Sequence, residues 1–221
     1  MTPIQLYESF IIKANANAQT NNISVDKGRF AMIFNESFTK FIEWVLDKKS
    51  DDDIRYIQPL LTPKKITAST AGENHQLFKL PTDFFDLGSV YATATGDCCK
   101  DVKLDLVEIK VDNENFILSN SDTKPSIEYR ESPYYLQGGH VKVFTDNFKV
   151  DSVQLTYYKY PKQIELIDEE DPESGFKDGD TPLGFDKKML DRIVSIAVSD
   201  YDLNTSNPRY QADKLRVSTK F

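Results

Sequence analysis

The sequence predicts an α+β fold, with helices towards both ends of the chain and an antiparallel sheet between them. Apolar residues recur at spacings of three and four before residue 50 and again after residue 186, which is typical of amphipathic helices. Between residues 66 and 160 the period changes to two, as in half-buried strands. No alternating β-α-β pattern calls for a parallel sheet.

The first 58 residues are expected to form a helical hairpin and a short third helix. Thr2 suits an N-cap and Pro3 the first helical position. The apolar stripe that follows consists of Ile4, Tyr7, Ile11, Ala14 and Ala18. The second helix is expected from an N-cap near Ser24 to about Lys49, and its apolar face comprises Phe30, Ile33, Phe34, Phe38, Phe41 and Val45. Because the connecting loop is short, the two helices should bury these stripes against each other.

Residues 51–157 are expected to form a short helix followed by the strands of the sheet. Three consecutive aspartates, Asp51 to Asp53, suit the start of a short helix through Ile57, because the helix dipole favours anions there. Pro59 and Pro63 then end the helical pattern. The expected strands are 77–80, 87–94, 102–106, 126–130, 141–143 and 153–157. The last two should form a hairpin around the turn at residues 145–147, and the others a meander.

The C-terminal part is expected to contain an acidic loop, a helix and a basic tail. The loop spans residues 168–184, and the helix begins after Asp186 as N-cap, with Phe185 stapled onto Leu190. Its expected buried face is Leu190, Ile193, Val194, Ala197 and Tyr201. We therefore predict one domain over residues 1–202, with a helical part at 1–58, a β part at 66–160, a helix at 186–202, and a docking tail at 203–221.

Charge is spread unevenly along the 221 residues, whose formal net charge is −8. Residues 203–221 contain 4 basic side chains against 1 acidic one, so the excess of acid lies in the body of the protein. An acidic body binds nucleic acid poorly, because such affinity comes mainly from phosphate neutralisation. The basic tail is interpreted either as an interaction arm or as a solvated tail that aids solubility.

The sequence also bears on the compartment of the protein. No apolar run approaches the roughly 18 residues of a membrane span, and Met1 to Leu6 lack the features of a secretory signal. Cys98 and Cys99 are the only two cysteines, and as neighbours they would form a strained disulfide. We expect a soluble protein with two reduced thiols in a reducing compartment, and no membrane partner.

Residues that carry catalysis or bind metals do not form a recognisable pattern. His75 and His140 lie in separate contexts, and the sequence contains no phosphate-binding glycine loop, no serine elbow and no zinc motif. The acidic stretch 168–180 fails the EF-hand pattern, since Pro172 and Glu173 occupy the fifth and sixth positions. We therefore expect no enzyme activity, no cofactor, and no catalytic, cofactor-binding or metal-binding residue.

Tyrosines concentrate in and around the expected sheet: Tyr129, Tyr134, Tyr135, Tyr157, Tyr158 and Tyr160. The run 157–160 places aromatic rings on both faces of one strand. Either another chain covers the second face, or the helices and loops of the same chain do so. Under the first alternative, Tyr158 and Tyr160 are candidate partner-binding residues.

Several segments, taken in order, resemble ring protein 1 of the crAss-like phages, a family of head-to-tail adaptors. The quoted segments are Ile23 to Phe30, Phe41 to Trp44, Leu80 to Phe85, Pro125 to Arg130, Val141 to Asp146, Leu155 to Pro161, Lys187 to Ala197 and Tyr210 to Phe221. None is chemically diagnostic by itself. The resemblance depends on their order and on their coverage of nearly the whole chain.

The resemblance implies a non-catalytic virion protein that joins the portal to the tail of a podovirus-type phage. It implies a closed ring of identical copies, expected to be a dodecamer, contacts with the portal and with the next tail ring or hub, and assembly in the cytoplasm of the bacterial host. Genomic DNA would pass through the lumen without sequence-specific binding. The tail residues expected to anchor such contacts are Arg209, Tyr210, Lys214, Arg216, Lys220 and Phe221. The alternatives are another tail component, such as a tail-hub or fibre-attachment module, and an enzyme with an unrecognised site.

Overall fold

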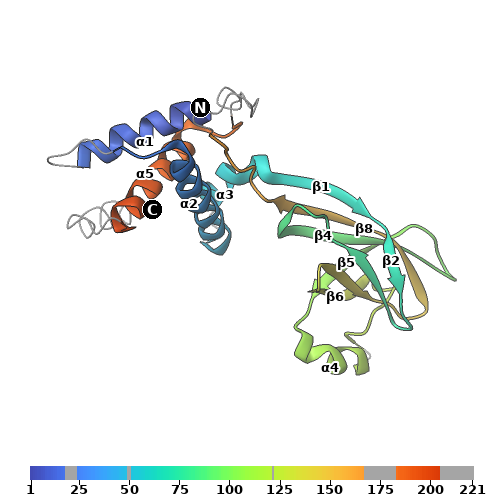
Figure 1. Ribbon diagram of the computed structural model, residues 1–221. Coiled ribbons are helices and arrows are strands. Elements are labelled where there is room, and N and C mark those ends of the chain that lie inside the picture. The colour runs from blue at the N-terminus through green and yellow to red at the C-terminus, as the bar shows by residue number, and fades with distance from the viewer. Residues whose placement is uncertain (18–23, 49–50, 121, 167–182, 205–221) are drawn as a thin grey trace. The chain divides into compact units, whose positions relative to one another are not determined.

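A computed structural model describes residues 1–17, 24–48, 51–120, 122–166 and 183–204 (Figure 1). The chain forms two compact units, which we call the helical unit (Met1–Pro59 with Pro161–Phe221) and the β unit (Leu60–Tyr160). Helices and a large sheet are both present, so the predicted α+β class is confirmed. The sequence analysis, which treated residues 1–202 as one domain, did not separate the two units. None of the described helices is long and apolar enough to cross a membrane.

The helical unit is organised around its C-terminal helix. Its helices are α1 (Pro3–Asn17), α2 (Lys27–Lys48), α3 (Asp51–Ile57) and α5 (Lys187–Asn204). α5 packs against both α1 and α2, and these contacts are more extensive than those between α1 and α2. The predicted hairpin is therefore incomplete: Tyr7 and Phe10 on α1 meet Phe30 on α2, with ring centroids 5.5 and 5.1 Å apart, but both helices also pack against α5.

Helix starts in this unit follow from local side-chain chemistry. Thr2 Oγ1 accepts a hydrogen bond from the Gln5 amide at 3.3 Å, and Gln5 Oε1 accepts one from the Thr2 amide at 3.1 Å. At α5, Asp186 Oδ1 accepts a hydrogen bond from the Lys188 amide at 2.6 Å, as predicted for an N-cap. The α2 cap is Asp26, whose carboxylate accepts from the Arg29 amide at 2.7 Å, and the predicted cap at Ser24 is wrong.

The buried face of α1 differs from the predicted one. Of the predicted stripe, Ala14 is fully buried, Tyr7 and Ile11 are half-buried and Ile4 is 42% exposed; Ala18 lies outside the described residues. Leu6 and Phe10, which were not predicted, are fully buried. The sequence of this helix contains two apolar stripes, and packing against α5 and α2 selects the one with the phenylalanine. On α5 itself the predicted face is confirmed, since Leu190, Ile193, Val194, Ala197 and Tyr201 are all buried.

The β unit contains one mixed sheet of eight strands. The strands are β1 (Leu61–Ile66), β2 (Ala68–Ala71), β3 (His75–Lys79), β4 (Phe84–Gly96), β5 (Val102–Glu108), β6 (Glu131–Gln137), β7 (His140–Phe144) and β8 (Phe148–Lys159). Their order in the sheet is β1-β8-β4-β5-β6-β7-β3-β2. The first and last strands of this order are separated only by Thr67, so the sheet curls back towards its own beginning.

Several sequence predictions for the sheet are wrong. Residues 127–130 form turns instead of a strand, and Arg130 has a positive φ of 59°. The strand β6 begins at Glu131, directly after the last residue of the predicted strand. It pairs in parallel with β5, and all other strand pairs are antiparallel. β1 was missed because it contains Pro63, which is tolerated where it faces the open edge of the sheet. The predicted hairpin around residues 145–147 is also wrong: β7 and β8 follow each other in the chain, but β7 pairs with β3 and β6, whereas β8 pairs with β1 and β4.

The interior of the curled sheet holds the core of the β unit. Its buried members are Ile66, Phe78, Ala92, Ala94, Leu104, Tyr134, Val141, Val143, Phe148, Val150, Val153, Leu155 and Tyr157. Gln76 shares the inner face of β3 with Phe78 and reaches β8. Its side-chain Nε2 donates to the Val150 carbonyl at 3.1 Å, and its Oε1 accepts from the Val150 amide at 2.6 Å. This side chain therefore makes the two hydrogen bonds that a neighbouring strand would otherwise make.

Candidate interaction surfaces

The predicted partner-binding residues divide into described and undescribed positions. Tyr158 is 8% exposed and Tyr160 is 55% exposed, so Tyr160 alone of the two offers most of its ring to solvent. Burial, together with the charge of Asp86, raises the pKa of Tyr158. The predicted tail residues Arg209, Tyr210, Lys214, Arg216, Lys220 and Phe221 lie outside the described residues, as does most of the acidic loop.

Tyr160 lies at a junction between the two segments Leu80 to Phe85 and Leu155 to Pro161. Asp83 occupies the centre of this junction. Its Oδ1 accepts a hydrogen bond from the Tyr157 hydroxyl at 2.9 Å, and its carbonyl accepts one from the Tyr160 amide at 2.9 Å. The junction thus fixes the end of β8 just before Pro161, where the chain passes from the β unit to the helical unit.

Aromatic pairs accompany these hydrogen bonds. Phe84 stacks on Tyr157 with ring centroids 5.8 Å apart, and Phe85 meets Tyr160 edge-on at 4.8 Å. Burial first, and then the hydrogen bond to Asp83, raise the pKa of Tyr157 to about 12. The Tyr157 hydroxyl therefore stays protonated at neutral pH and serves as a fixed donor. The junction holds Tyr160 in a set orientation while leaving its ring accessible.

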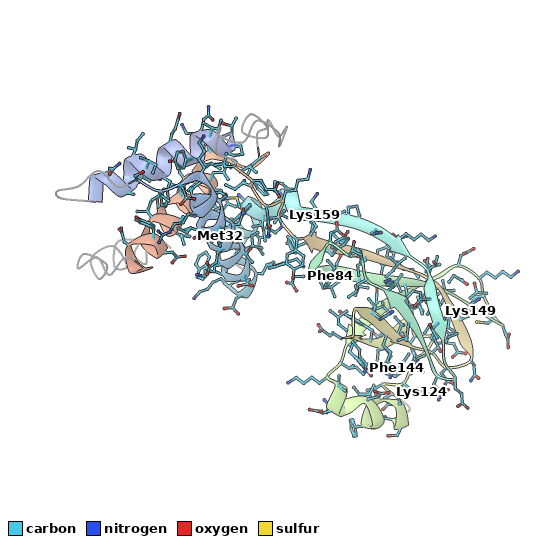
Figure 2. All side chains as sticks on the ribbon, viewed as in Figure 1. Met32, Phe84, Lys124, Phe144, Lys149 and Lys159 are labelled. Atoms are coloured by element: carbon cyan, nitrogen blue, oxygen red, sulfur yellow. The ribbon has the colours of Figure 1, made fainter. Side chains whose placement is uncertain are left out.

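A second cluster anchors the connection between β5 and β6, which contains the short helices η2 (Val111–Asn113) and α4 (Glu114–Ser119). Glu114 accepts hydrogen bonds from the Tyr135 hydroxyl at 2.9 Å and from Lys142 Nζ at 3.1 Å. Lys142 also lies over the rings of Tyr135 and Phe144, with its Nζ 5.1 and 4.9 Å from their centroids. Phe144 is labelled beside α4 in Figure 2. These contacts attach α4 to β6 and β7.

Titration of Glu114 is governed by this anchor. Burial alone would raise its pKa, but the hydrogen bonds from Lys142 and Tyr135 and the charge of Lys142 outweigh burial and lower the pKa below its ordinary value. For Lys142, burial opposes the charged form, yet the same partners raise its pKa. Both groups therefore stay charged at neutral pH, and the cluster is a stabilising ion pair.

Replacing Glu114 with glutamine is expected to destabilise the β unit by about 1–3 kcal/mol at neutral pH, because charge-assisted hydrogen bonds are lost. A lowered carboxyl pKa contributes stability above the unfolded pKa of about 4.3, and this contribution is lost as the pH falls. The stability difference between wild type and Glu114→Gln should therefore shrink between about pH 6 and about pH 3 in urea titrations.

Asp146→Asn provides the matched control for this experiment. Asp146 pairs with Lys124 at 3.1 Å, but both side chains are well exposed, at 38% and 47%. An exposed pair of this kind contributes about 0–1 kcal/mol. A stability difference for Glu114→Gln that is no larger than the control, or that does not change with pH, would contradict the anchoring role.

The anchored connection displays apolar side chains that sequence reasoning missed. Phe116 on α4 is 68% exposed and Val111 on η2 is 57% exposed, while Tyr129 in the turn before β6 is 77% exposed. Residues 109–120 carry no clear helical stripe, because α4 has only six residues. The available signal was the short apolar run from Phe116 to Leu118, together with Val111 between Lys110 and Asp112, which a period-based search does not detect.

Residue types that bind metals or react as nucleophiles are also placed by the structure. Cys98 is exposed and Cys99 half-buried in the turn between β4 and β5, and both thiols are free. Over the ranges described, no three His, Cys, Asp or Glu side chains are grouped in a way that would hold a metal ion. The His75 ring lies near the Phe144 ring, with centroids 6.5 Å apart, and His140 Nδ1 lies 3.0 Å from the carbonyl oxygen of Gly138, within hydrogen-bond distance.

The β unit thus carries two surface features: the Tyr160 junction, which exposes the ring of Tyr160, and the α4 anchor, which exposes the ring of Phe116. No protein-family model matches the chain, and no curated protein matches it at a significant level.

Proposed function

We propose that the protein is a structural head-to-tail connector of a tailed-phage virion. In this proposal, identical copies form a closed ring directly beneath the portal and above the next tail ring or hub. The ring is assembled in the bacterial cytoplasm and remains in the neck of the virion, where the genome passes through its centre. The chain acts through contacts with protein partners and performs no catalysis.

The observation that carries the proposal is the exposure of three aromatic rings in the β unit. Phe116, Tyr129 and Tyr160 each expose more than half of their side chains. Large aromatic side chains contribute strongly to protein–protein interfaces, because they bury much area at low entropic cost. Their exposure in a unit that already has a well-filled core is consistent with cover by another protein chain.

The resemblance to crAss-like ring proteins gives the second line of support. Two of the segments that carry it, Leu80 to Phe85 and Leu155 to Pro161, meet at Asp83 through the hydrogen bonds to Tyr157 and Tyr160. Segments separated by about seventy residues therefore form one structural feature.

The charge of the chain fits a channel through which DNA moves. The formal net charge is −8, and the sequence pI is about 4.9. Attractive contacts between Lys or Arg and DNA phosphates would slow ejection, whereas an acidic ring leaves DNA free to slide. We therefore propose that DNA is a passing cargo and that the binding partners are proteins.

Cryo-electron microscopy of the virion that contains this chain tests the proposal. The expected result is a ring of identical copies in contact with the portal. Placement at the tail hub or at a fibre attachment point would support the alternative function of a different tail component. A virion neck without this polypeptide would overturn the connector assignment.

A further inference from the structure

One side of the sheet of the β unit carries both apolar and acidic side chains. Leu104 of β5 is buried in the core, so its neighbours Asp105 and Val107 alternate with the inward positions and face outwards. Both are exposed, with Val107 at 49%. This outer face of β5 is the first part of a surface that we call the β5–α4 surface.

β6 extends this surface by a second carboxylate. In the parallel register, Asp105 lies opposite Glu131, and Val107 lies opposite Pro133. Glu131 is exposed. Two like charges on neighbouring positions of adjacent strands destabilise a sheet. The amine of Lys103 on the same face lies over the Tyr91 ring at 4.2 Å, so a further cation beside Asp105 and Glu131 would relieve this cost.

The η2–α4 connection lies on the same side of the sheet. Its anchor residues Tyr135 and Lys142 alternate with the core residues Tyr134, Val141 and Val143, and therefore face outwards. The connection adds the exposed Val111 and Phe116, with Asp112 and Lys110 on either side of Val111. The complete β5–α4 surface consists of Asp105, Val107, Val111, Asp112, Phe116 and Glu131, three carboxylates and three apolar side chains. Lys103 on the outer face of β5 and Lys110 beside Val111 lie next to it.

The C-terminal tail has the complementary composition. Residues 205–221 contain four basic side chains and one acidic one. Lys214, Leu215, Arg216 and Val217 alternate basic and apolar residues, and Phe221 adds an aromatic ring at the end of the chain. A segment of this kind can place cations beside carboxylates and apolar groups beside Val107, Val111 and Phe116.

We propose that the β5–α4 surface binds the C-terminal tail, residues 205–221, of a second copy of this chain. Each copy then carries both a donor tail and an acceptor surface. Such a contact is heterologous, and repeated head-to-tail contacts generate a closed ring when the rotation between copies closes. The inference rests on the proposed connector function, to which it adds the contact that joins neighbouring subunits. Each single contact need only be weak, because closure of the ring makes the contacts act together.

A fluorescently labelled peptide of residues 205–221, titrated with the full-length protein, tests the contact without requiring assembly. We expect saturable binding that weakens about tenfold or more in the variant Asp105→Asn/Asp112→Asn/Glu131→Gln, since three surface ion pairs are removed. Binding should also weaken as salt increases. The matched control, Glu73→Gln/Asp97→Asn/Asp101→Asn, removes three exposed charges elsewhere on the same unit and should bind like the wild type.

Two results would overturn the inference: no saturable binding at millimolar protein, or equal weakening in the two triple variants. The origin of the tail is tested by mixing unlabelled and nitrogen-15-labelled full-length protein and coupling lysines to carboxylates with a carbodiimide. Cross-links from Lys214 or Lys220 to the β5–α4 surface that join labelled to unlabelled chains are expected. Cross-links confined to one isotope would show that the tail binds its own chain, and would overturn the role of a second copy.

These tests separate the inference from the proposed function. They need neither portal nor virion. Peptide binding together with a virion neck that lacks the polypeptide would overturn the connector function alone. A ring beneath the portal together with absent peptide binding would overturn the tail contact alone.

Discussion

Replacing Gln76 with leucine is expected to lower the free energy of unfolding of the β unit by about 2–6 kcal/mol. Gln76 is 4% exposed, and its amide makes both hydrogen bonds to the backbone of Val150. Leucine has a similar volume, so the change removes the hydrogen bonds with little change in packing. It leaves one buried N–H and one buried C=O without partners, and each unsatisfied group costs about 1–3 kcal/mol.

Urea unfolding followed by circular dichroism measures this loss, and hydrogen exchange at the Val150 amide localises it. Gln137→Leu is the matched control, because Gln137 lies exposed at the end of β6. The same substitution there should change stability by no more than about 0.5 kcal/mol. Should Gln76→Leu behave like Gln137→Leu, or leave Val150 exchange unchanged, the role of Gln76 in holding β3 to β8 would be refuted.

Replacing Phe10 with alanine is expected to destabilise the helical unit by about 3–5 kcal/mol. Phe10 on α1 is fully buried. Its ring lies 5.1 Å from that of Phe30 on α2 and 5.8 Å from that of Tyr201 on α5. This side chain of α1 thus contacts both α2 and α5, and its truncation leaves a cavity that none of the three helices can fill without moving.

Trp44 fluorescence measures this effect, because Trp44 is the only tryptophan and lies in α2. Ile12→Ala on the same helix is the control: Ile12 is 69% exposed, and alanine is a good helix former, so stability should change little. Met32→Ala serves likewise on α2, where Met32, labelled in Figure 2, is 75% exposed. Equal losses for Phe10→Ala and Ile12→Ala would contradict the packing described for α1.

Local chemistry made several elements predictable. The caps at Thr2 and Asp186 act within three residues, and the alternation in β7 and β8 reflects one wet and one buried face. The sequence predicts a strand over Ser126 to Arg130, because apolar and polar residues alternate there, but the strand β6 spans Glu131–Gln137. In the structure Arg130 adopts a positive φ, and pairing with β5 selects the next seven residues.

The candidate surfaces were predictable only in part. Tyr158 and Tyr160 were chosen from the same motif, yet one is buried and the other exposed. Tyr158 lies within β8 between its partners Leu61 of β1 and Asp86 of β4, whereas Tyr160 follows Lys159, the last residue of the strand. The Asp83 junction joins residues about seventy positions apart. The exposed Phe116 depends on where Glu114 attaches a short helix, which periodicity does not report.

The sequence by itself determined the α+β class, the N-terminal starts of α1 and α5 at Thr2 and Asp186, and the contrast between an acidic body and a basic tail. These features arise from interactions between residues close together in the chain, or from composition alone. Only the tertiary structure decided which stripe of α1 is buried, that α5 packs against both α1 and α2, that β5 and β6 are parallel, and that Gln76 joins β3 to β8. Each of these depends on partners far away in sequence, where several arrangements satisfy the local pattern and the free energy of packing selects one.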